Sequence, residues 1–366
     1  MTGFLAAPMP ELPASVIGLG ISVPDMSFTR KIAGAIGGAS VLFFAIGVFL
    51  PPTARVEREL AIDAHPATVF ALLNDFHQVN KWSRWLATDP NTRVDISGPT
   101  RGVGATMTWS GNIIGSGTQV IVSSEPLRKI STRLSLQDIG DIDTSFWLTA
   151  TEFGTTVLWR YENDFGRNIF GRYYGLLLDG IVGADYEQGL ASLKAMAESL
   201  PPTDFADLEV EHIVVTATDI AYMETSSEPL AAAISEAMGN AYFAVLNFMD
   251  RHGLQEAGAP LSISRAFDGS ELRFDAAIPV RGIVATTPRV QDSVRLGRTY
   301  GGAAILIKHR GSYLQLAATH NKIAAYLAAL GISRNGDAWE SYVSDPTRTT
   351  EAELITHIFY PISGEN

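Results

Sequence analysis

Hydrophobic and polar residues follow regular patterns over two long parts of the chain, residues 55–200 and 209–363. Alternation with a period of two predicts half-buried strands, and apolar residues three to four positions apart predict amphipathic helices. Because segregated strands and helices favour an α+β arrangement, the first part predicts a curved sheet that grips a long helix. We assign a strand to 56–62, a short helix to 66–74, and four or five strands to the stretch ending at residue 161. A long helix, interrupted or kinked at Gly180 and Gly183, is assigned to 168–200.

The second part contains an internal repeat of strand, helix, strand and strand. The segments that end the two copies, 274–280 and 356–362, align without a gap, and each has a proline next to its last residue. One copy cannot bury both a sheet face and a helix, so two copies are expected to pack side by side and to leave a ligand cleft between them. The predicted elements are 213–217, 229–252, 261–267 and 271–278 in the first copy, and 302–309, 312–330, 338–343 and 353–360 in the second.

The stretch 32–50 contains no charged residue and directly follows Arg30 and Lys31. An uncharged run of about 18 residues or more is long enough to cross a bilayer as a helix. We therefore predict a single-pass transmembrane anchor, with a cleaved signal peptide and a buried core helix as the alternatives. The basic pair predicts a bacterial-type inner-membrane protein with extracytoplasmic C-terminal domains. Residues 1–31 predict a disordered tail, and 201–208 predicts a linker.

The charge and the cysteine count exclude several functions. The net charge is −12 and neither patterned part is basic, which argues against nucleic acid as a partner, because phosphate binding needs a positive surface. The chain has no cysteine, so disulfides, zinc–thiolate sites and cysteine nucleophiles are excluded. The histidines are scattered, and we interpret His309, His320 and His357 as surface or structural residues. No metal site and no cofactor is predicted, since neither a paired-histidine motif nor a phosphate-binding glycine loop is present.

Three short segments of the first part carry a resemblance to a known family: Val56-Glu57-Arg58, 80–85 and 185–190. They resemble the START-related, polyketide-cyclase-like superfamily, whose domains have a helix-grip fold. The resemblance covers residues 55–200 and implies an elongated apolar ligand cavity between the sheet and the long helix. That superfamily includes lipid carriers, cyclases and co-chaperones, so the fold does not fix the function. We interpret Trp82 and Trp85 as core or cavity wall.

In the second part, the predicted strand 338–343 places an acidic residue beside aromatic ones. Side chains alternate along a strand, so Glu340 and Tyr342 share one face while Trp339 points to the other. If the face of Glu340 is buried, its carboxylate loses hydration and needs a partner. That partner is either a bound cation or polarised ligand, or an internal base such as Lys308 or Arg310.

Further motifs accompany this strand. Trp339-Glu340-Ser341-Tyr342 is followed by Asp345-Pro346, Glu353-Leu354 and Pro361-Ile362. Together with the repeat, these motifs resemble the GyrI-like effector-binding domain found in AraC-type and multidrug-responsive regulators. The resemblance implies that Glu340 lies at the floor of a pocket for cationic aromatic ligands. No helix-turn-helix precedes this part of the chain, which argues against a DNA-binding regulator.

A pocket for a flat cation needs aromatic walls and a negative charge. We therefore predict a membrane-anchored protein that binds or sequesters hydrophobic or amphipathic small molecules, often cationic ones. The alternative is a hydrolase that detoxifies electrophilic natural products, with Glu340 as general base and Tyr342 polarising the leaving group. A pure interaction protein is the third class. The predicted ligand-binding residues are Tyr222, Phe274, Tyr300, Tyr313, Trp339, Glu340, Tyr342 and Tyr360.

Overall fold

The structure, a computed structural model, describes residues 26–83, 88–137 and 140–363. The chain divides into two compact units, one formed by Met1–Ala54 and Phe165–Leu176, the other by Arg55–Asp164 and Leu177–Asn366. Of the tail predicted at 1–31, residues 1–25 lie outside the described residues. A helix begins at Met26, so the last residues of that predicted tail are helical.

The first unit contains two helices, α1 (Met26–Phe49) and α5 (Ile169–Gly175). The ring of Phe43 stacks on that of Tyr173 with a centroid distance of 4.2 Å. Arg172 Nη1 donates to the carbonyl oxygens of Val48 and Leu50, at 2.7 and 3.1 Å, and so satisfies groups that a helix C-terminus leaves without intrahelical partners. Across the part of the chain that the structure describes, no helix is long and apolar enough to cross a membrane, so the anchor predicted at 32–50 is not supported.

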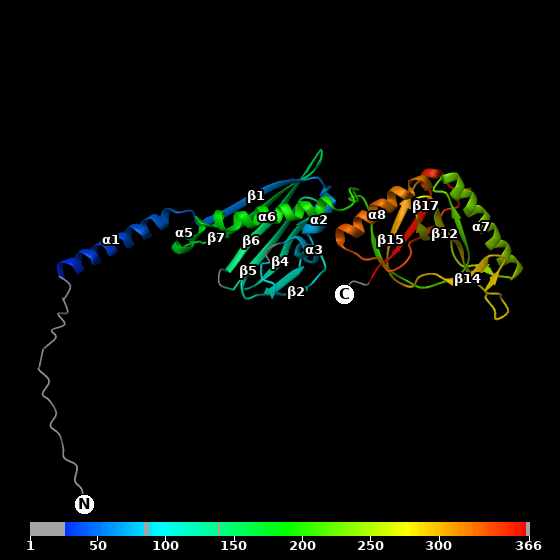
Figure 1. Cartoon of the computed structure of the whole chain (residues 1–366), viewed down its shortest axis with the longest axis horizontal. Helices are drawn as coiled ribbons and strands as arrows, with labels where there is room; N and C mark the ends of the chain where they lie inside the picture. Colours follow the sequence, from blue (N-terminus) through cyan, green and yellow to red (C-terminus); the bar gives the residue numbers. More distant parts are fainter. Residues whose placement is uncertain (1–25, 84–87, 138–139, 364–366) are drawn as a thin grey trace, which may run out of the picture. The chain divides into compact units, whose positions relative to one another are not determined.

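The second unit contains a seven-stranded antiparallel sheet in the order β1-β7-β6-β5-β4-β3-β2, with α2, α3 and α6 packed against one face (Figure 1). Six strands of this sheet follow α3, one or two more than the pattern predicted. The elements are β1 (Thr53–Ile62), α2 (Pro66–Leu73), α3 (Phe76–Trp82), β2 (Arg93–Ser97), β3 (Thr106–Ser110), β4 (Ser116–Glu125), β5 (Lys129–Leu136), β6 (Gly140–Thr151), β7 (Gly154–Asp164) and α6 (Leu178–Glu198).

The core of this sheet lies between its inner face and α6. Ile130 from β5 and Leu193 from α6 are fully buried in the same cluster. Trp82 also belongs to this core, and its indole Nε1 donates to the carbonyl oxygen of Leu72 at 3.2 Å. The position of Trp82 therefore agrees with its interpretation as a core residue, whereas Trp85 lies outside the described residues.

The predicted interruption of the long helix at Gly180 and Gly183 is wrong. The helical stretch breaks earlier, between α5 and α6, and both glycines lie inside α6. Gly183 packs against the guanidinium of Arg58, which pairs with Asp179 at 2.9 Å and with Glu187 at 2.7 Å on the same helix. The missing side chain of Gly183 therefore allows the close approach of the Arg58 guanidinium.

A second antiparallel sheet of ten strands has the order β13-β14-β9-β12-β11-β16-β17-β15-β8, with β10 paired to β12. Two helices, α7 (Ala231–Arg251) and α8 (Leu316–Leu330), pack against this sheet (Figure 1). The other elements are β8 (Glu211–Val215), β9 (Asp219–Ser227), β10 (Gln255–Glu256), β11 (Leu261–Phe267), β12 (Leu272–Arg281), β13 (Val290–Gln291), β14 (Val294–Arg298), β15 (Gly302–Arg310), η1 (Tyr313–Gln315), β16 (Trp339–Tyr342), η2 (Glu351–Glu353) and β17 (Ile355–Pro361).

The repeat is visible in this sheet as β9-α7-β11-β12 and β15-α8-β16-β17, and the two copies meet where β11 pairs with β16. The strand expected to open the first copy, 213–217, corresponds to β8, which instead pairs with β15 of the second copy. Gly331 ends α8 in the left-handed region at φ 65°, as a helix C-terminus often requires. The predicted α+β class, with a helix-grip sheet followed by a duplicated unit, is confirmed.

Gly180→Ala and Gly183→Ala form a matched pair that tests this description of α6. A methyl group at Gly180 meets nothing within 4 Å, so Gly180→Ala should raise the free energy of unfolding by about 0.5–1 kcal/mol. A methyl group at Gly183 would overlap the Arg58 guanidinium and break its ion pairs, so Gly183→Ala should not stabilise the protein. Urea unfolding followed by circular dichroism measures both. Equal stabilisation by the two substitutions would contradict the packing of Arg58 on α6.

Candidate functional site

Glu340 lies in the middle of the second sheet, on the face against which α8 packs. Across the sheet, Ala276 lies opposite Ser262, Ser262 opposite Glu340, and Glu340 opposite Ile358, so their side chains share one face. Ile358 is fully buried in the cluster formed with α8. The Glu340 side chain is only 15% exposed. The acid therefore sits, largely removed from water, where the two copies of the repeat meet.

Both carboxylate oxygens of Glu340 have hydrogen-bond partners. His320 Nε2 lies 2.7 Å from Oε1, and Tyr342 OH donates to Oε2 at 2.6 Å. Within the described residues, no lysine or arginine forms an ion pair with Glu340. Lys308, predicted as an alternative partner, pairs with Glu211 at 2.6 Å, and Arg310 is exposed. An internal partner for Glu340 is therefore present, but it is a histidine and not the predicted Lys308 or Arg310.

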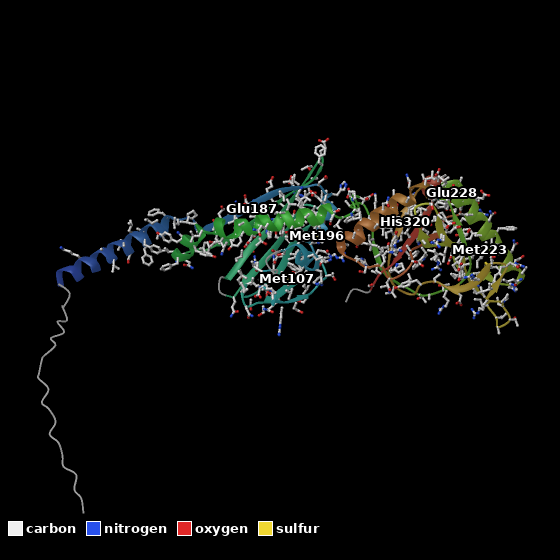
Figure 2. All side chains as sticks on the ribbon, in the orientation of Figure 1. Met107, Glu187, Met196, Met223, Glu228 and His320 are labelled. Atoms are coloured by element: carbon white, nitrogen blue, oxygen red, sulfur yellow. The ribbon has the colours of Figure 1, made fainter. Side chains whose placement is uncertain are left out.

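His320 lies on α8 (Figure 2), and its two ring nitrogens connect Glu340 to the neighbouring strand. Its second ring nitrogen, Nδ1, lies 2.7 Å from Tyr360 OH on β17. The guanidinium carbon of Arg334 lies 5.1 Å from the ring centroid of Tyr360. The result is a continuous hydrogen-bonded chain Tyr342–Glu340–His320–Tyr360 that links β16, α8 and β17.

The Glu340 carboxylate affects the ionisation of the surrounding tyrosines. Burial, followed by the charge of Glu340, raises the pKa of Tyr342 well above its ordinary value, and raises the pKa values of Tyr242 and Tyr313 in the same way. Burial raises the pKa of Tyr360 to about 12, with Arg334 opposing and Glu340 reinforcing the shift. These phenols therefore stay protonated at neutral pH. Among the described residues, no group of three or more His, Cys, Asp or Glu side chains is arranged to hold a metal ion.

The structure brings together four of the predicted ligand-binding residues: Glu340, Tyr342, Tyr313 and Tyr360. Tyr313 comes from η1, and its ring centroid lies 5.4 Å from that of Tyr342 in an edge-on arrangement. Phe274 is on the same face but is 2% exposed on β12 of the first copy, two strands away from Glu340. Three tyrosine side chains, from β16, η1 and β17, thus surround the single carboxylate of Glu340.

The other three predicted residues, Tyr222, Tyr300 and Trp339, lie on the opposite face of the sheet. They belong to a cluster with Leu261 and Ile263, and Trp339 stacks on Phe359 with a centroid distance of 4.7 Å. The structure does not bring them to Glu340, because adjacent positions on a strand point to opposite faces.

Sequence reasoning missed two residues of the site, His320 and Tyr242. Tyr242 comes from α7 and donates to the carbonyl oxygen of Leu261 at 2.8 Å, and the charge of Glu340 contributes to its pKa. A signal for His320 was present in the sequence, because Leu316, His320 and Ile323 are spaced as one face of a helix. A histidine inside an otherwise apolar helical stripe indicates a buried polar contact.

The first sheet carries two further features. On its inner face, Gln119 Nε2 donates to Thr132 Oγ1 at 2.8 Å, and the hydroxyls of Thr132 and Thr144 lie 2.7 Å apart, so a polar row crosses β4, β5 and β6. On the outer face of β1, β7 and β6 there is a shallow groove of about 460 Å³. It is lined by Glu59, Trp147, Thr149, Thr156, Leu158 and Arg160.

The effect of Glu340 on the tyrosines gives a testable prediction. Because the carboxylate helps to raise the pKa values of Tyr342, Tyr360 and Tyr313, Glu340→Gln should lower the pH at which these phenols ionise. Their pKa values are raised in the folded state, so their contribution to stability is complete below pH 10 and is lost as the pH rises through 12 and above. Tyrosinate absorbance during an alkaline titration measures the shift. An unchanged titration in Glu340→Gln, or the same shift in the exposed-acid control Glu211→Gln, would contradict it.

Several solved structures share similarity with part of the chain. The EcmrR protein in its complex with DNA matches with a TM-score of 0.38 and 12% identity, over 43% of this chain and 58% of that chain. A hydrolase from Listeria innocua has a TM-score of 0.32 and 16% identity, over 42% of this chain and 92% of its own. The di-domain ARO/CYC StfQ of the steffimycin biosynthetic pathway has a TM-score of 0.31 and 16% identity, over 40% and 51%. No curated protein matches the chain.

Two family models match successive parts of the chain. The family described as polyketide cyclase / dehydrase and lipid transport matches residues 53–198, which span β1 to α6. The family described as GyrI-like small molecule binding domain matches residues 212–363, which contain the Glu340 site. The chain therefore carries a domain of the polyketide cyclase / dehydrase and lipid transport family, followed by a GyrI-like small-molecule-binding domain.

Proposed function

We propose that the GyrI-like domain binds amphipathic cations and that Glu340 meets their positive charge. The observation that supports this proposal is the acid Glu340, whose side chain is 15% exposed and which has no lysine or arginine partner among the described residues. Removing a carboxylate from water costs free energy, and neither of its hydrogen-bond partners, His320 and Tyr342, carries the fixed positive charge of a lysine or arginine. A ligand cation would add the missing counter-charge.

The surrounding phenol rings suit the apolar part of such a ligand. Tyr313 and Tyr342 stand edge-on to each other near the carboxylate, and Tyr360 lies on the adjacent strand. A cation over an aromatic face gains about 0.5–2 kcal/mol, and a hydrogen bond to a charged group contributes about 1.5–3 kcal/mol. A carboxylate and one or two rings therefore supply enough free energy to select charged ligands over neutral ones.

We propose a separate, apolar ligand for the first domain. A cluster of three aromatic rings supports this proposal. The ring centroid of Trp159 lies 4.7 Å from that of Phe146 and 5.9 Å from that of Trp82. The polar row of Gln119 and two threonines beside this core offers hydrogen bonds to a ligand with a few polar atoms.

Hydrolysis by Glu340 and Tyr342 has less support. A general base must reach water, and a tyrosine that assists a leaving group needs its hydroxyl proton free for substrate. Here Tyr342 OH donates to Glu340 itself, and His320 engages the other oxygen. The two proposed catalytic groups thus satisfy each other, and the hydrolase alternative stays a prediction.

Binding at Glu340 would serve to sequester such compounds. The inner-membrane location and the orientation expected from residues 32–50 also stay predictions.

Isothermal titration calorimetry with tetraphenylphosphonium, a lipophilic cation without hydrogen-bond donors, tests the proposal. Glu340→Gln keeps the shape of the side chain and removes its charge. We expect the affinity to fall by about ten- to a hundredfold, equivalent to about 1.4–2.8 kcal/mol. Glu211→Gln is the matched control, because Glu211 is an exposed acid paired with Lys308 outside the site.

The control variant should bind as the wild type does. Equal dissociation constants for wild type and Glu340→Gln would contradict the proposal. An equal loss in both variants would show that overall acidity, not Glu340, attracts the cation. Melting temperatures of the variants establish that each is folded.

A further inference from the structure

Helix α8 packs with two opposite faces into two different hydrophobic clusters. Ile323 belongs to the cluster on the second sheet, on the side from which His320 reaches Glu340. Ala325 and Ala329 belong to a separate cluster and are 1% and 0% exposed. With about 3.6 residues per turn, His320 and Ala329 are about two and a half turns apart and so point to opposite sides of the helix. One face of α8 therefore holds the Glu340 site, and the other face is buried elsewhere.

The buried alanine face of α8 packs against the first domain. Its cluster includes Ala67 and Ala71 of α2, which are also buried. The other face of α2 packs into the core of the first sheet, where Leu72 is fully buried. Both domains belong to the second of the two compact units. Two helices thus lie back to back between the two cores, α2 on the first and α8 on the second.

The first domain also caps the C-terminus of α8. Gln78 of α3 is 2% exposed, and its Nε2 donates to the carbonyl oxygen of Leu330 at 2.8 Å. Lys81 Nζ donates to Gln78 Oε1 at 3.0 Å. Because the last carbonyls of a helix have no intrahelical partner, this bond replaces a missing one. A side chain at Gly331 would overlap Gln78 Nε2, so the glycine also makes room for the cap.

The segment 201–208, predicted as a linker, strengthens the same contact. Phe205 is 8% exposed and belongs to the cluster of the α2 and α8 alanines. Its ring centroid lies 5.8 Å from that of Tyr326 on α8. Lys322 Nζ, also on α8, donates to Asp207 Oδ1 at 2.7 Å. The segment that joins the domains is therefore packed on α8, which restricts independent motion of the two domains.

We propose that α8 couples the two domains, so that a cation bound at Glu340 stabilises the first domain as well as the second. This inference rests on the proposed function of Glu340 and adds a partner within the same chain that responds to the ligand. A ligand that binds only the folded site stabilises every element that the site requires. The site requires α8, because His320 comes from it. In turn, α8 relies on α2 for its alanine face and on Gln78 for its C-terminus.

Hydrogen exchange of backbone amides, followed by mass spectrometry on the full chain, tests the coupling. Amides that exchange only when α2 and α8 open together report the stability of the shared unit. Tetraphenylphosphonium is added to about a hundred times its dissociation constant. Exchange in α2 should then slow about tenfold or more, approaching about a hundredfold where the two helices open only together. The same cation should slow exchange in α8 and β16.

Two matched variants of α8 separate coupling from binding. Ala329→Glu places a charge in the contact with α2 and leaves the His320 face of α8 unchanged. The cation should therefore still protect α8 and β16 but no longer protect α2. Ala324→Glu introduces the same side chain at an exposed position of the same helix and should behave as the wild type does. Melting temperatures establish folding, and if Ala329→Glu does not fold, Gln78→Ala should weaken the protection of α2 several-fold.

A further variant tests the coupling without any ligand. Ile323 is fully buried in the cluster on the second sheet and is not part of the cluster with α2. Ile323→Val removes one methylene group from the packing of α8 on that sheet and should speed exchange there by about two- to tenfold. If the domains are coupled, amides of α2 in the first domain should exchange faster by a similar factor.

Protection of α8 and β16 in the wild type without any change in α2 would overturn the inference and leave cation binding at Glu340 intact. Full protection of α2 in folded Ala329→Glu would overturn it as well. Failure of the wild type to bind tetraphenylphosphonium would instead overturn the proposed function. Ile323→Val would then decide the coupling by itself, since unchanged exchange in α2 would contradict it.

Discussion

The hydrogen bonding of the Glu340 carboxylate is the interaction on which the rest of the site in the second domain depends. A carboxylate on a side chain that is only 15% exposed is stable only if other groups replace the water it has lost. Tyr342 reaches it from the same strand, and His320 reaches it from α8, so a strand and a helix must hold their positions relative to each other. Tyr360 then fixes the far side of the imidazole. The site is thus part of the packing of α8 on the sheet.

The duplication places Glu340 at the junction of the two copies. The residues that differ between the copies provide the polar groups around it. At the junction of the two copies, the partner opposite Glu340 is Ser262, a small neutral residue. The aligned ends of the copies differ in the same way, since Ile278 of the first corresponds to Tyr360 of the second. One copy contributes the acid and the polar chain attached to it, and the other contributes apolar packing and Tyr242. Two charged copies facing each other would place like charges together, which is destabilising.

The sequence predicts the fold better than the site. Strand alternation, the repeat and the turn residues predict the α+β class and most elements, because each depends on local pattern. The break between α5 and α6 and the pairing of β8 with the second copy depend on tertiary contacts, and local pattern does not contain them. At the site, alternation correctly groups Glu340 with Tyr342. Tyr222 and Tyr300, predicted from their aromatic rings alone, lie on the other face. His320, interpreted as surface or structural, instead contacts Glu340 from α8.

A crystal structure of the protein with tetraphenylphosphonium bound tests the central claim most directly, because it shows which side chains surround the charge. The account predicts the cation on the α8 face of the second sheet, with Glu340 as the nearest carboxylate and phenol rings of Tyr313 or Tyr342 against its phenyl groups. A cation seated on the opposite face beside Trp339 and Phe359, or in the groove at Trp147 of the first domain, would contradict it.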